Sequence, residues 1–154
     1  MHTALEARSP LIGCGTPVVL CATDGRTRHE HVVETAADLA SDLAATVLVL
    51  HVRRPSPLTG FDLAVAGLAA VWATQLQQQS LTSAAEILRR HGVPGAFWTT
   101  AASPVPEILQ LARRTAARAV VVSSCPRRRS DSWWHACPVR ALQHRAPCFV
   151  VTAS

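Results

Sequence analysis

The chain has 154 residues and a formal net charge of +5, from 15 basic and 10 acidic residues. Its hydrophobic fraction of 49% and charged fraction of 16% exclude an intrinsically disordered chain and fit one domain of ordinary size. All the basic charge is arginine, scattered along the chain with few aromatic residues nearby, so nucleic-acid binding is not expected.

No apolar region typical of a secretory signal opens the chain. The longest apolar stretch, residues 63–73, is much shorter than the roughly 20 residues that a membrane-spanning helix needs. An odd number of cysteines without a signal argues against a disulfide framework. We therefore expect a cytoplasmic protein that does not enter the membrane.

The first part of the chain predicts a tail followed by a strand, a helix and a second strand. Residues 1–16 are expected to be a flexible tail, and residues 17–154 the folded domain. Pro17–Thr23 is a short apolar run typical of a strand buried on both faces, and Asp24-Gly25 ends it with a turn signal. Thr46–Val52 predicts the second strand. Between the two strands, apolar residues recur at helical spacing: Val32, Val33, Ala36, Leu39, Ala40 and Leu43.

A long helix is predicted from Phe61 to about His91, with Gly92 at its end. Its buried stripe is expected to contain Leu63, Gly67, Ala70, Thr74, Leu81, Ala85 and Leu88. Gly95–Ala101 predicts the third strand. The next helix is predicted to start with Ser103 as N-cap and Pro104 at its first position, and to keep an apolar face as far as Ala116.

The last part of the chain predicts a strand, a short helix and a strand, at Ala119–Ser123, Pro138–His144 and Phe149–Thr152. Strands that alternate with helices imply an α/β fold with parallel pairing and right-handed crossovers. None of the strands has a polar face, so helices should cover both sides. We therefore expect a doubly wound, Rossmann-like domain with a five-stranded parallel sheet in the order 3-2-1-4-5.

In such a sheet, ligands bind at the carboxyl ends of the strands where the strand order reverses. In the order 3-2-1-4-5 this point lies between the first and fourth strands. The loops that begin at Asp24-Gly25 and Ser123-Ser124 are therefore the candidate site.

Four motifs, in the expected order, resemble the universal stress protein family over residues 17–152. They are Val19–Gly25 (VLCATDG), Leu48–Val52 (LVLHV), Pro104 with Glu107–Leu109 (EIL), and His144–Val151 (HRAPCFVV). The resemblance implies a fold of the adenine nucleotide alpha hydrolase type and, in members that bind ATP, a contact between the nucleotide and the acidic residue after the first strand. That residue is Asp24 here, which could equally serve only to form the turn.

ATP-binding members of the family carry G-x-x-G-x9-G-[ST] after the fourth strand, and this chain departs from all four fixed positions. Ser123, Pro126, Ala136 and Cys137 stand there. Glycine lets bare N–H groups approach a phosphate, whereas proline has no N–H and a thiol is a weak hydrogen-bond partner. We expect no cofactor, or an adenine nucleotide such as ATP bound only weakly.

Several other residues leave alternatives open. Arg127-Arg128-Arg129 could bind an anion or be a solvated loop, and Trp133-Trp134 could pack on the domain or form a stacking surface. The cysteines and histidines lack the C-x2-C spacing of a metal site, and no catalytic residue is identified. Cys148 is expected inside a buried strand, where a free cysteine packs as a small hydrophobic residue.

We therefore expect a non-catalytic stress-response or regulatory domain that acts through dimerisation and partner binding. The alternative is a module that responds to ATP, AMP or another anion in a modified pocket. The dimer is predicted to form along the fifth strand, through Phe149, Val150, Val151 and Thr152, because an open apolar edge invites pairing. The family resemblance implies the same interface. The alternative is a monomer in which the N-terminal tail or Trp133-Trp134 covers this edge.

Overall fold

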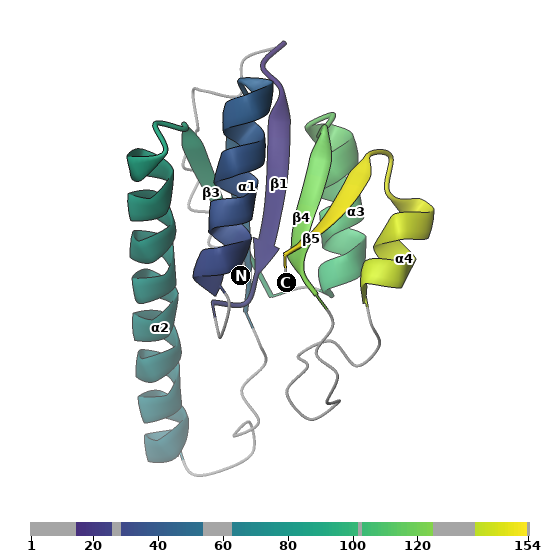
Figure 1. Ribbon diagram of the computed structural model, residues 1–154. Coiled ribbons are helices and arrows are strands. Elements are labelled where there is room, and N and C mark those ends of the chain that lie inside the picture. The colour runs from purple at the N-terminus through teal and green to yellow at the C-terminus, as the bar shows by residue number, and fades with distance from the viewer. Residues whose placement is uncertain (1–14, 26–28, 54–62, 102, 125–137, 154) are drawn as a thin grey trace.

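The computed structural model describes residues 15–25, 29–53, 63–101, 103–124 and 138–153 (Figure 1). The chain alternates strands and helices throughout. In order they are β1 (Val18–Thr23), α1 (His29–Leu43), β2 (Thr46–Val52), α2 (Leu63–Arg90), β3 (Gly95–Thr100), α3 (Pro104–Arg114), β4 (Ala119–Ser123), α4 (Pro138–Arg145) and β5 (Phe149–Ala153). The boundary predicted between a tail and a domain at residue 16 stays a prediction, because most of that tail lies outside the described residues.

The strands form one parallel sheet in the order β3-β2-β1-β4-β5, which confirms the predicted fold. β1 lies at the centre, where Cys21 pairs with Val49 of β2 on one side and with Val121 of β4 on the other. α1 and α2 cover one face of the sheet, and α3 and α4 cover the other (Figure 1).

The two faces of the sheet make two separate cores. Val19 and Cys21 face α1 and α2, whereas Val18 and Leu20 face α3 and α4, as the period of two along a strand requires. Every residue of β1 and β2 is buried, and all of them are apolar except Thr23, Thr46 and His51 at or next to the strand ends. Burial raises the pKa of the Cys21 thiol to about 12, and this cysteine packs as a small hydrophobic residue.

The edge strands differ from this pattern, and the expectation that helices cover both sides of every strand holds fully only at the centre of the sheet. Trp98 on β3 is 45% exposed and Phe149 on β5 is 83% exposed. An edge strand has a neighbour on one side only, and four helices leave parts of both edges open.

The predicted buried stripe of α2 is only partly right. Leu88 is buried as predicted and Leu81 is half-buried, whereas Gly67, Ala70, Thr74 and Ala85 are exposed. The other residues that face the core are Ser80, Ala84 and Ile87. The prediction extended one stripe along the whole helix, but only the C-terminal half packs on α1, β2 and β3. Among the described residues, no helix has the length and apolarity needed to cross a bilayer.

Three smaller expectations fail at the ends of elements. Leu43, in the last turn of α1, is 41% exposed. Ala116 lies beyond the end of α3, is exposed, and has a positive φ of 47°. Cys148, expected inside a buried strand, precedes β5 and is only half-buried. In each case the residue lies at or beyond the end of its helix or strand, where the neighbouring layer no longer covers the side chain. Ser103 is the N-cap of α3 as predicted, but its side chain makes no capping hydrogen bond.

Candidate functional site

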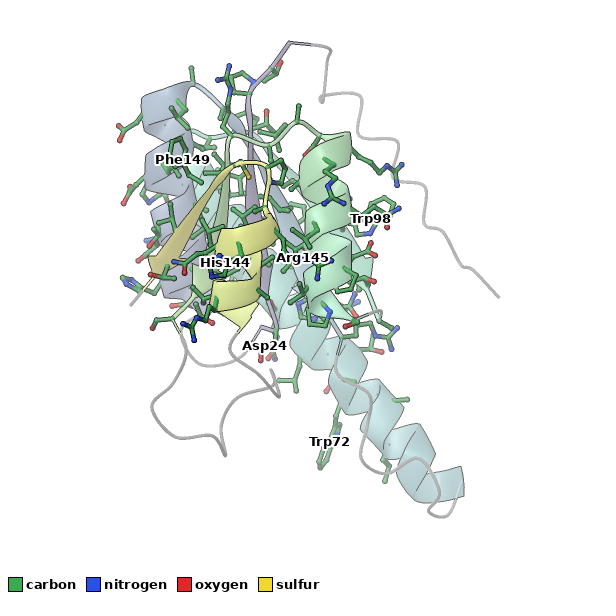
Figure 2. The ribbon with its side chains drawn as sticks, turned by 90° about the vertical axis from the view of Figure 1, so that its right-hand side faces the viewer. Asp24, Trp72, Trp98, His144, Arg145 and Phe149 are labelled. Atoms are coloured by element: carbon green, nitrogen blue, oxygen red, sulfur yellow. The ribbon has the colours of Figure 1, made fainter. Side chains whose placement is uncertain are left out.

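The candidate site lies at the carboxyl edge of the sheet, where β1 and β4 lead to helices on opposite faces. Asp24 follows β1 directly and lies at that edge (Figure 2). Ser123 is the last residue of β4 and pairs with Ala153, and the N–H of Ser124 donates to the Ala153 carbonyl oxygen at 2.9 Å. Asp24 and Ser123 thus end the two neighbouring strands that topology selects.

The rest of the predicted nucleotide loop lies outside the described residues. This applies to Pro126, Arg127, Ala136 and Cys137, to Arg128 and Arg129, and to Trp133 and Trp134. The loss of the phosphate-binding loop therefore stays a prediction drawn from residue types.

A buried polar cluster lies beside Asp24, on the face that α1 and α2 cover. It consists of Thr23, His29, His51 and Ser80, whose exposed fractions lie between 4% and 6%. Thr23 of β1 and His51 of β2 lie on the same face of the sheet as Cys21 and Val49, and each is the last residue of its strand on that face. The cluster closes this core at the carboxyl edge, and it joins β1, β2, α1 and α2.

Hydrogen bonds define the protonation of His29. Its Nε2 lies 2.9 Å from the Ser80 carbonyl oxygen, which can only accept, so Nε2 carries the proton. In the neutral ring, Nδ1 then accepts from the Thr23 hydroxyl at 2.8 Å. Thr23 Oγ1 in turn accepts from the Gly25 N–H at 3.1 Å. This chain of bonds holds the Asp24-Gly25 turn against α2.

Both histidines of the cluster favour the neutral form. Burial lowers the pKa of His29 below its usual value of 6.5, against smaller opposing effects of the Ser80 carbonyl, Glu30 and Asp24. Burial also lowers the pKa of His51, and the nearby His29 and Arg53 add to this effect while Asp24 opposes it. Two neutral imidazoles are consistent with the hydrogen bonds of the cluster.

Gly25 allows the turn to pack directly on the cluster. Its φ is +74°, and a Cβ at this position would lie 2.9 Å from His51 Cε1 and 2.9 Å from Ser80 Oγ. The buried Nδ1 of His51 has no hydrogen-bond partner among the described residues. Buried polar atoms usually have a partner, so this nitrogen is the atom of the cluster whose hydrogen bonding the described residues do not account for.

The cluster pairs one hydroxyl with a base, Thr23 with His29, but both side chains are buried, and Ser80 has no such partner. Ser80 Oγ lies 3.3 Å from His29 Nε2, yet the proton on this nitrogen is directed at the Ser80 carbonyl oxygen. A general base needs a free lone pair within reach of the proton that it removes. In the part of the chain that the structure describes, no group of three or more His, Cys, Asp or Glu side chains could hold a metal ion.

The sequence carried only part of the signal for this cluster. The period of two along the strands places Thr23 with Cys21 and His51 with Val49, on the face of α1 and α2. His29 and Ser80 are 51 positions apart in the chain, and no short motif joins them.

The fold and the position of the site define a doubly wound α/β domain of the kind that binds ligands at a switch point. A model of the universal stress protein family matches residues 16–152. The chain therefore belongs to the universal stress protein family. A comparison with curated proteins gives no match.

Solved structures of the family share this fold. A family protein from Burkholderia pseudomallei has a TM-score of 0.64 and 22% identity, with 91% of this chain and 97% of that one covered. The Archaeoglobus fulgidus protein in complex with dAMP has a TM-score of 0.61 and 20% identity, covering 90% and 98%. The Arabidopsis thaliana protein with AMP bound has a TM-score of 0.60 and 16% identity, covering 88% and 90%.

Proposed function

We propose that this domain is a non-catalytic regulatory protein of the stress response, which acts in the cytoplasm through dimerisation and partner binding rather than through ATP turnover. The observation that carries the proposal is the outer edge of β5, which pairs with no other strand in the described part of the chain. The free thiols of Cys21 and Cys148 fit a reducing compartment.

The backbone of β5 presents hydrogen-bonding groups to the outside. The Ala153 carbonyl accepts from Ser124, so Ala153 and, by alternation, Val151 direct their N–H and C=O groups at β4. Val150 and Thr152 therefore direct theirs outward. Phe149 is 83% exposed beside them, and β5 has no charged side chain to prevent pairing. A twofold axis would pair two such edges antiparallel.

The residue types of the nucleotide loop support the proposal that the domain does not act through ATP turnover. Ser123, Pro126, Ala136 and Cys137 replace the glycines and the hydroxyl residue of ATP-binding members. Each lost charge-assisted hydrogen bond to phosphate removes about 1.5–3 kcal/mol, and every 1.4 kcal/mol or so is a tenfold change in affinity. Several such losses leave little affinity for the triphosphate.

The second candidate function is a module that responds to a nucleoside monophosphate or another anion in a modified pocket. The buried Nδ1 of His51, without a partner among the described residues and beside the Asp24-Gly25 turn, favours this candidate. The relatives with dAMP and AMP bound support it as well. A base and ribose could be held at this edge without the triphosphate loop.

Light scattering on wild type, Val150→Pro and Val150→Ala tests the association. Proline removes an outward N–H without breaking a hydrogen bond to β4, whereas alanine keeps that N–H. We expect wild type and Val150→Ala to associate at tens of micromolar, and Val150→Pro to lose the association that β5 makes and to have a lower mean mass than wild type. A monomeric wild type, or a folded Val150→Pro protein that reaches the same mean mass as wild type, would refute the β5 interface. Circular dichroism confirms folding.

A further inference from the structure

The N-terminal half of α2 carries an exposed apolar stripe. Leu68, Val71, Trp72 and Leu76 are 61%, 54%, 66% and 64% exposed. Their spacing of three and four residues places them on neighbouring turns of one helix face. A large apolar patch on a protein surface usually marks a place where something else binds.

This half of α2 extends past the sheet. The helix has 28 residues, or roughly 42 Å at about 1.5 Å per residue, whereas a strand of 6 residues such as β1 spans only about 20 Å. Figures 1 and 2 show the N-terminal part of α2, with Trp72, projecting beyond the carboxyl edge at which Asp24 lies. The sheet therefore provides no cover for the stripe.

The same part of the helix has no charge. No Asp, Glu, Lys or Arg occurs from Leu63 to Ala85, and the first ion pair of α2, between Glu86 and Arg89, lies near its C-terminus. Without ion pairs or packing, a helical segment of this length is only marginally stable in water. Its apolar stripe accordingly needs a partner surface, and that partner is not selected by charge.

We propose that the partner is the α2 stripe of a second copy of this chain, packed antiparallel about a twofold axis at Trp72. Leu68 and Leu76 lie four residues before and four residues after Trp72. An antiparallel pair centred on Trp72 places Leu68 against Leu76 of the partner subunit, and the reverse, as a self-complementary interface requires. Two uncharged stripes meet without repulsion, and a central tryptophan is a typical anchor of an interface.

This interface is separate from the β5 edge. β5 and β3 are the two edges of the sheet, and α2 packs on the side of β2 and β3. The α2 contact neither uses nor blocks Val150 and Thr152. If the α2 contact does not form, the proposed function is unaffected. If the β5 dimer does not form, the α2 contact can still be tested in the same chain.

Sedimentation equilibrium of the full chain tests the proposal, with Trp72→Glu and its matched control Thr74→Glu. Both variants place one negative charge on an exposed position of the same uncharged helix, but Thr74 points away from the stripe. We expect association through α2 to weaken about tenfold or more in Trp72→Glu and to be unchanged in Thr74→Glu. Measurements in the Val150→Pro background isolate the α2 contact. Equal association of all these proteins would overturn the proposal.

The direction of the pair is tested with Leu68→Lys, Leu76→Glu and the double variant. In the antiparallel pair each new lysine faces a new glutamate of the partner subunit, so the double variant should associate better than either single variant. A parallel pair would set like charges against each other, and absence of recovery would refute the antiparallel arrangement.

Hydrogen exchange of wild type gives a readout that needs no variant. Amides of residues 67–79 should become more protected as protein concentration rises, because a second copy covers them. Protection that is independent of concentration would show that the chain covers its own helix, and would overturn the proposal.

Discussion

Thr23 and His29 show how much of the candidate site depends on single atoms. The Thr23 hydroxyl accepts from Gly25 and donates to His29, while His29 donates to α2 at Ser80. The other neutral tautomer of His29 would lose the bond to Ser80, and protonation would reverse the direction of the bond to Thr23. The turn that carries Asp24 is thus held by a neutral histidine.

Gly25→Ala should destabilise the domain more than Gly92→Ala. Both glycines have positive φ, +74° and +64°, and alanine in this region costs about 1–2 kcal/mol. Only at Gly25 would the new Cβ also meet buried neighbours, His51 and Ser80, at 2.9 Å, whereas Gly92 has open space. Urea unfolding of both variants measures the difference. If both variants lose the same free energy of unfolding, the cluster can move to accept the new Cβ, and its packing does not hold the turn.

Acid should destabilise the protein through the two buried histidines. Their pKa values lie below 6.5 in the folded state and near 6.5 when the chain is unfolded, so the unfolded state binds more protons as pH falls. Stability should therefore be unaffected by these groups above about pH 7 and should decline from about pH 6.5 downward, until the pH reaches their folded pKa values.

Urea midpoints at about pH 7.5 and about pH 5.5 check this sign. His51→Leu should reduce the fall in midpoint between the two pH values, and the exposed His144→Gln should leave it as in wild type. A wild-type midpoint that is the same at both pH values, or that rises on acidification, would contradict the account.

At the scale of elements, the central strands were predictable because their residues point to one state. Val18–Thr23 and Thr46–Val52 are apolar, rich in β-branched residues and bounded by turn signals, and both are buried throughout. The phase of α2 was not predictable in the same way. Its apolar residues follow two faces, one that packs on the sheet through Ala84 and one that is exposed at Trp72, and composition alone does not say where the sheet ends.

The candidate site was likewise predictable only in part. Asp24 and Ser123 could be placed from topology, since parallel strands bring their carboxyl ends to one edge. The bond between His29 and Ser80 could not, because it depends on how two helices pack at a distance of 51 positions in the chain. The orphaned Nδ1 of His51 depends on the same packing.

At the scale of the whole molecule, two surfaces are available for association at different sides of the sheet. β5 and the projecting half of α2 lie on different sides of the sheet (Figure 1). The outer edge of β5 presents backbone groups, and this half of α2 presents apolar side chains. Two different twofold contacts on one chain can build assemblies larger than a dimer. Association through these surfaces, with no need for ATP, is the central claim for this member of the universal stress protein family.

Calorimetric titration of nucleotide-free protein with ATP and with AMP tests that claim most directly. If Ser123, Pro126, Ala136 and Cys137 replace the phosphate-binding residues as the sequence predicts, ATP should bind no more tightly than AMP, with a dissociation constant of about a millimolar or weaker. A micromolar dissociation constant for ATP, tighter than that for AMP, would contradict it, because the loop would then still hold the triphosphate.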